Sequence, residues 1–194
     1  LSKNFEEKKI INKLKIQILT SMIFYQNTIG VITPLKIWNK SLYHGGYDIS
    51  FHYSLSTLKE SDLIILDSKF HRELWNTDID KIHSDIFQLK KRSHKLIYFD
   101  TTDSTGCIQK ELLDSVDTYW KMQILKNKEF SKSSHYGNRL FTDYYYKENN
   151  IVDNDVLLSK PIISNDNLDK ITSAWNYGLS DYSKWSKIKN YLFK

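Results

Sequence analysis

With 194 residues, of which 40% are hydrophobic and 26% charged, the chain has the size and composition of one globular domain with a buried core. The longest apolar runs, such as residues 63–66, are too short to span a bilayer, and the single cysteine, Cys107, excludes an internal disulfide bond. The net charge of +5 favours anionic partners, and the cysteine usage favours a cytoplasmic location. Because the chain begins at Leu1 and not at Met, we expect a fragment or a processed product.

Hydrophobic periodicity predicts a first strand over residues 14–19 and a loop over residues 21–30. A helix should then begin at Thr33 and Pro34, with proline at its first position, and end at Gly45 and Gly46. Further strands are expected over residues 47–53 and 62–67. A helix over residues 78–92 leads into another strand that includes Leu96.

The second half of the chain has a weaker pattern. We expect a fifth strand over residues 116–123, a tyrosine-rich helix or loop over 142–149, a helix over 165–177 and a last amphipathic helix over 183–193. Strands that are apolar throughout, separated by helices, are typical of a mainly parallel sheet covered on both faces. The sequence therefore predicts an α/β fold with a C-terminal helical segment, in a single domain over residues 1–194.

The loop after the strand at Leu96 carries the strongest candidate site. Its polar residues can bind a sugar hydroxyl, a phosphate or a metal, because ligands of open α/β sheets bind at the carboxyl ends of strands; they are Asp100, Asp103, Ser104 and Thr105, followed by Gly106. The alternative is that Asp103 or Ser104 only caps the next helix. The two aspartates are three residues apart, which departs from the Asp-x-Asp pattern of haloacid-dehalogenase phosphatases.

Lys69 follows the preceding strand and is expected at the same edge of the sheet, where it can meet a phosphate with help from His71 or Arg72. The alternative is a solvated turn. The glycines match neither a dinucleotide-binding fingerprint nor a phosphate-binding loop. The histidines never pair at metal-ligand spacing, so no metal site is predicted.

Residues 135–146 combine aromatic rings with polar side chains. Tyr136, Arg139 and Asp143 suit stacking on sugar rings and hydrogen bonding to their hydroxyls, and His135 is a candidate base. The same mixture suits single-stranded nucleic acid. The alternative is that the tyrosines cover the sheet as a half-buried layer.

Four blocks of sequence together resemble a known family: SDLIILDSK at residues 61–69, YFDTTDSTG at 98–106, VDTYWKMQ at 116–123, and YGNR with FTDYY at 136–145. They are similar to the N-terminal region of glycosyltransferase-like proteins encoded in bacterial surface-polysaccharide loci. The resemblance implies the Rossmann-like, acceptor-side half of a two-domain glycosyltransferase of the GT-B kind. It also implies that a second Rossmann-like domain, absent from this chain, binds the nucleotide-sugar donor, so no cofactor is expected here.

The leading hypothesis is an acceptor-side domain of a hexosyltransferase-like enzyme in capsule, lipopolysaccharide or exopolysaccharide biosynthesis, inactive without its donor-binding domain. An inverting enzyme needs a general base, for which Asp103 is the first candidate, followed by Asp100 and His135. Substrate-binding roles are predicted for seven residues, namely Lys69, Ser104, Thr105, Gly106, Tyr136, Arg139 and Asp143.

The expected partner is a glycan or a lipid-linked glycan acceptor, which suits a peripheral contact with the inner face of the cytoplasmic membrane. No amphipathic segment of the chain is strongly basic, however. The alternative hypothesis is a non-catalytic glycan- or protein-binding module of the same fold. A nucleic-acid binder is disfavoured, because the lysines do not cluster on one predicted element.

Overall fold

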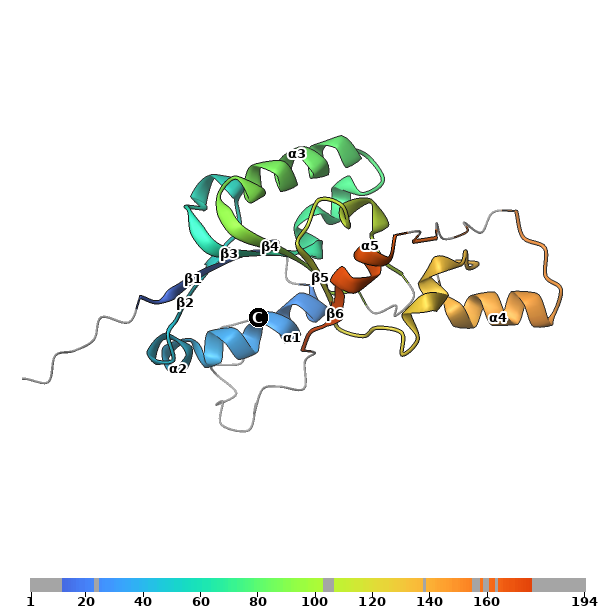
Figure 1. Cartoon of the computed structure of the whole chain (residues 1–194), viewed down its shortest axis with the longest axis horizontal. Helices are drawn as coiled ribbons and strands as arrows, with labels where there is room; N and C mark the ends of the chain where they lie inside the picture. The colour runs from blue at the N-terminus through green and yellow to red at the C-terminus, as the bar shows by residue number, and fades with distance from the viewer. Residues whose placement is uncertain are drawn as a thin grey trace, which may run out of the picture.

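The computed structural model describes residues 12–22, 25–102, 107–137, 139–154, 158, 161–162 and 164–175. These residues form a Rossmann-like α/β fold around a six-stranded, all-parallel sheet with the strand order β2-β1-β3-β4-β5-β6 (Figure 1). The strands are β1 (Leu14–Leu19), β2 (Tyr47–His52), β3 (Ser61–Asp67), β4 (Ser93–Asp100), β5 (Thr118–Lys121) and β6 (Ile171–Ser173). Since β2 and β3 flank β1 on opposite sides, the order of the strands reverses between β1 and β3. This is the topological switch point, where open α/β sheets bind their ligands.

Helices cover both faces of the sheet (Figure 1). On one face lie α1 (Gln26–Ile37) and α2 (Asn39–His44), and on the other lie α3 (Ile79–Lys90) and the 3₁₀ segment η2 (Ser68–Leu74). Short 3₁₀ turns occupy the loops, namely η1 (Leu55–Thr57), η3 (Lys110–Leu112) and η4 (Lys128–Lys132), and two further helices are α4 (Leu140–Glu148) and α5 (Asn165–Lys170).

Successive side chains of each strand point to opposite faces, and this alternation sorts the core into two layers. Leu66 and Tyr98 pack in the layer under α3, whereas Ile65 and Phe99 pack in the layer under α1. The same alternation continues to the strand ends. It sends Asp67 to the α1 face and Asp100 to the α3 face, and so separates two acidic side chains at one edge of the sheet.

Most of the elements expected in the first half of the chain are confirmed. The predicted strand over residues 14–19 matches β1 at both ends. Asp78 caps α3 by accepting a hydrogen bond from the Lys81 N–H, as the start of the predicted helix suggests. Gly46 follows α2 with φ of 97°, a conformation that glycine adopts without strain. The tyrosine-rich segment forms a helix, α4.

Two predictions were wrong. Residues 21–30 are not all loop, because α1 begins at Gln26 and Pro34 lies inside it. Proline lacks an N–H to donate, yet the helix continues past it and ends at Ile37, where packing of Val31 and Ile32 against the sheet outweighs the lost bond.

The predicted helix over residues 165–177 also ends early. It stops at Lys170, and β6 then pairs in parallel with β5. The β-branched residues Ile171 and Thr172 favour this extended conformation. The predicted helix over residues 183–193 lies outside the described residues.

None of the helices in the described ranges is long and apolar enough to cross a membrane.

Candidate functional site

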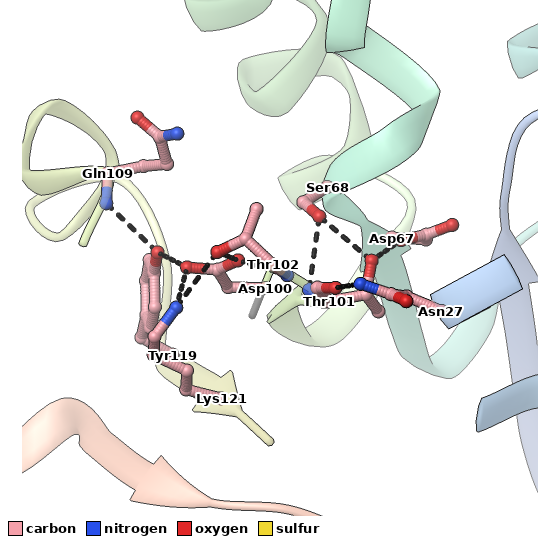
Figure 2. A network of polar contacts seen from close by, with 9 residues as sticks. All are labelled: Asn27, Asp67, Ser68, Asp100, Thr101, Thr102, Gln109, Tyr119 and Lys121. Atoms are coloured by element: carbon pink, nitrogen blue, oxygen red, sulfur yellow. Dashed lines mark hydrogen bonds and ion pairs between the residues drawn. The ribbon is translucent and has the colours of Figure 1, made fainter. Parts of the chain in front are cut away.

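Two polar clusters lie at the carboxyl edge of the sheet, one on each face (Figure 2). The first is centred on Asp67 at the end of β3, and the second on Asp100 at the end of β4. We call them the Asp67 cluster and the Asp100 cluster. Both carboxylates are buried, with 3% and 0% of their surface exposed, so their hydrogen-bond partners decide what each can do.

Hydroxyl groups surround Asp67. Its Oδ2 accepts hydrogen bonds from Thr20 at 2.8 Å and Thr28 at 2.9 Å, and its Oδ1 accepts from the Thr101 hydroxyl at 2.9 Å and the Lys69 N–H at 3.2 Å. Within the described part of the chain, Asp67 forms no ion pair. Burial raises the pKa of the carboxyl above its ordinary value, although the four hydrogen bonds act in the opposite direction.

The Asp67 cluster joins three elements at the switch point. The Ser68 hydroxyl accepts from the Thr101 N–H at 3.1 Å and lies the same distance from the Thr101 hydroxyl (Figure 2). Asn27, in the first turn of α1, donates to the Thr101 carbonyl at 3.1 Å. These bonds hold the start of α1 against the ends of β3 and β4.

The Asp100 cluster is built on a lysine. Lys121 of β5 donates to Asp100 Oδ2 at 2.8 Å, and the Tyr119 hydroxyl donates to the same oxygen at 2.6 Å. The other oxygen accepts from the N–H and the hydroxyl of Thr102, at 2.9 and 2.6 Å. Tyr119 in turn accepts from the Gln109 N–H, and Lys121 donates to Thr102 as well (Figure 2). Lys121 and Tyr119 are fully buried, so this ion pair is closed to solvent.

The cations of Lys69 and Arg72 and the carboxylate of Glu73 lie near the Tyr25 side chain, just before α1. Tyr25 precedes α1 and supplies no side-chain acceptor to its first turn, which carries no acidic residue. Arg72 lies 4.7 Å and the Lys69 ammonium 6.0 Å from the centre of the Tyr25 ring. The first turn of a helix leaves N–H groups without intrahelical acceptors, and these groups attract anions. A phosphate would therefore meet two cations and a helix N-terminus here.

The structure brings together only some of the residues predicted from the sequence. Lys69 and Asp100 share the carboxyl edge, as expected from their places after neighbouring strands. Asp103, Ser104, Thr105 and Gly106 lie outside the described residues. Their predicted roles remain predictions.

His135, Tyr136 and Asp143 form a separate cluster at α4. The carboxylate of Asp143 accepts from the Tyr136 N–H at 3.2 Å and from Lys147 at 2.6 Å. His135 Nδ1 lies 3.2 Å from the same carboxylate, and its Nε2 lies 2.6 Å from the Phe130 carbonyl oxygen. Burial acts to raise the pKa of Asp143, but the hydrogen bonds from Lys147 and His135 outweigh it and hold the pKa below its ordinary value. Protein groups therefore already engage both ring nitrogens of His135.

Arg139 directly precedes α4. Burial raises the pKa of the Cys107 thiol, and Asp100 adds to this effect, whereas Lys121 and Arg139 oppose it. The charges of Asp100, Lys121 and Arg139 therefore all affect the pKa of Cys107. A raised pKa keeps the thiol protonated at neutral pH, which disfavours a nucleophilic role.

Sequence reasoning gave no site role to Asp67 or Lys121. Asp67 carried a usable signal, because it is a carboxylate directly after an apolar strand, like Asp100. The signal for Lys121 was weaker: it follows Tyr119 by two residues in β5, so the two side chains point to the same face of the sheet. Thr20 carried the same signal as Asp67, because it directly follows the apolar strand β1. The contribution of Thr28 depends on how α1 packs, and no local pattern reveals that packing.

The described residues contain no group of three histidine, cysteine, aspartate or glutamate side chains able to hold a metal ion. A pocket of about 290 Å³ lies at the opposite edge of the sheet, where Asp62, Arg92 and His94 are among its lining residues. No family model matches the chain, and neither the curated proteins nor the solved structures contain a significant match.

Proposed function

We propose that this chain is the acceptor-binding domain of a glycosyltransferase in bacterial surface-polysaccharide biosynthesis. The observation that carries the proposal is the hydroxyl-rich, cation-fronted switch point between β1 and β3. Open α/β sheets bind ligands at such points. A lipid-linked glycan combines the two chemistries that this edge suits, a phosphate and a ring of hydroxyl groups.

In this proposal the phosphate lies against Lys69, Arg72 and the first turn of α1. The sugar next to the phosphate lies over the carboxyl edge, outside the buried threonine hydroxyls that donate to Asp67. A nucleotide-sugar donor and a second Rossmann-like domain complete the enzyme. A lipid-linked acceptor also places the protein at the inner face of the cytoplasmic membrane.

Asp103 remains the first candidate for the general base. A base needs a free lone pair within reach of the acceptor hydroxyl. The carboxylate oxygens of Asp100 each accept two hydrogen bonds, and both nitrogens of His135 face acceptors. These engaged side chains favour, as the second candidate function, a non-catalytic glycan-binding module of the same fold. If a two-domain protein that carries the Asp103→Asn change still transfers sugar, Asp103 is not the general base.

Titration calorimetry with glucose 1-phosphate tests the binding step, and glucose serves as the uncharged comparison. We expect glucose 1-phosphate to bind more tightly and its affinity to fall as salt rises. The Lys69→Ala/Arg72→Ala variant should lose about tenfold or more in affinity, because hydrogen bonds to charged groups contribute roughly 1.5–3 kcal/mol each. Lys95→Ala, a change at an exposed lysine near the start of β4, is the matched control. Equal binding by the double variant and the control would overturn the proposed phosphate site.

A further inference from the structure

Helix α4 projects away from the sheet, beyond β6 (Figure 1). Its inner side is held by polar contacts. Asp143 bonds His135 and Lys147, and Tyr146 donates to Asp153 at 3.0 Å while its ring stacks on Tyr136. Among the described residues, the side chains on the outer side form no such polar contacts.

Three aromatic side chains form a stripe along this outer side. Phe141, Tyr144 and Tyr145 are spaced three and four residues apart, so they share one face of the helix. Their exposed fractions are 60%, 59% and 59%. More exposed apolar side chains lie on the segments that flank α4, including Phe130 at 51% and Val152 at 84%. An aromatic patch of this kind marks an interaction surface.

Charged residues stand at both ends of the stripe. Arg139 precedes the helix, and its guanidinium lies 5.8 Å from the centre of the Phe141 ring. Glu148 is the last residue of α4 and follows Phe141 by seven residues, which is two turns along the same face. Both side chains are exposed, and neither forms an ion pair within the described part of the chain.

We propose that a second copy of this chain docks on this face, with the two α4 helices antiparallel about a twofold axis near Tyr144. A twofold interface joins the same patch on both copies, so each contact away from the axis occurs twice. About this axis Tyr144 meets its own counterpart and Phe141 meets Tyr145 of the other copy. Arg139 then reaches Glu148 of the other copy. The midpoints of these pairings lie at residue 144, at residue 143 and between the two, so the aromatic contacts and the ion pairs fit within one residue of a common register.

The charges of α4 and its flanking residue favour a second copy of the chain over a membrane. Arg139 and Lys147 balance Asp143 and Glu148, so α4 presents no net positive charge to attract anionic lipid. The aromatic residues also suit a protein interface, where tyrosine and phenylalanine are enriched. Three such side chains on each copy bury less than the ~800 Å² per partner of a standard interface, so we expect a weak, concentration-dependent dimer.

Sedimentation velocity on the full chain tests the proposal over about a hundredfold range of protein concentration. The mass should rise from 23.1 kDa towards twice that value. Arg139→Glu and Glu148→Arg should each weaken the dimer about tenfold or more, because each places like charges opposite one another. The double variant Arg139→Glu/Glu148→Arg should restore it, since the pairs form again with their signs exchanged.

Lys95→Glu is the control for a charge reversal away from α4, and circular dichroism checks that every variant is folded. A wild-type chain that stays monomeric at every concentration overturns the proposal, as does a double variant no better than the single ones. A monomer whose tyrosine fluorescence changes with maltohexaose would identify the stripe as a sugar platform instead, and would likewise overturn it.

Discussion

Asp67 and Asp100 end neighbouring strands and are both buried at the carboxyl edge of the sheet, but their hydrogen-bond donors differ. Three of the four donors to Asp67 are hydroxyl groups, which can also accept. Asp100 receives two donors that cannot accept, the Lys121 ammonium and the Thr102 N–H, and these lie on different carboxylate oxygens. The first arrangement can reorganise when a carboxyl gains a proton or a ligand arrives, and the second cannot.

This difference in hydrogen-bond donors indicates different roles for the two clusters. The Asp100 cluster fastens β4 to β5 through an ion pair closed to solvent. The Asp67 cluster organises the start of α1, in front of which Lys69 and Arg72 lie. We therefore expect substitutions at Asp100 to affect stability and those around Asp67 to affect binding.

The largest effect is expected for Asp100→Asn. In either orientation, the NH₂ group of the asparagine would face a group that can only donate, the Lys121 ammonium or the Thr102 N–H. Lys121 would also keep a buried charge without its partner. Breaking a buried ion pair in this way costs about 3–5 kcal/mol of unfolding free energy. Urea denaturation followed by circular dichroism measures it.

The double variant Asp100→Leu/Lys121→Met is the control for that prediction, because it removes both charges together. It should be less destabilised than Asp100→Asn, since replacing a buried pair with apolar residues is often neutral. If the double variant is the less stable of the two, the ion pair does not act as we describe.

A smaller, pH-dependent effect is expected at a third buried carboxylate, Asp85, which is paired with histidine. His71 Nε2 donates to Asp85 at 3.1 Å, and its Nδ1 has no hydrogen-bond partner among the described residues. Burial lowers the pKa of His71 below 6.5, although Asp85 opposes the shift. The unfolded chain therefore binds the proton first as pH falls, and stability is lost from about pH 6.5 downwards.

The melting temperature of the wild type should fall between pH 7.5 and 5.5 more steeply than that of His71→Gln. His94→Gln changes an exposed histidine and should retain the wild-type slope. Parallel slopes for the wild type and His71→Gln would show that His71 does not titrate as described.

The smallest effect on stability is expected for Asp67→Asn. The asparagine oxygen can accept from Thr101 and the Lys69 N–H, while Thr20 and Thr28 turn their hydroxyls to accept from the new amide. Because burial raises the pKa of Asp67, the neutral form is favoured in the fold, and its ionisation weakens stability as pH rises through the folded pKa. We expect a change within about 1 kcal/mol in urea denaturation at pH 7. A loss as large as that of Asp100→Asn would erase the distinction between the clusters.

Much of the fold follows from local patterns in the sequence. Apolar runs predicted β1 and β3, and Asp78 marked the start of α3. Pro34 misled the prediction of α1, because the packing of Val31 and Ile32 against the sheet overrides the local preference of proline. Three-residue β6 depends on an open edge beside β5, which no local pattern shows.

The site was predictable to a smaller degree. Asp100 and Lys69 could be placed at one edge because each follows a strand. The partners of Asp100 could not, because the pairing of Asp100 with Lys121 depends on the register between β4 and β5. That register is fixed by the fold as a whole.

Chemical-shift mapping of the ¹⁵N-labelled chain with glucose 1-phosphate tests the central claim most directly. We predict that amide shifts concentrate at the carboxyl edge, in the first turn of α1, at Lys69 and at Thr101. Shifts confined to the opposite edge, around Asp62 and Arg92 in the pocket there, would contradict it.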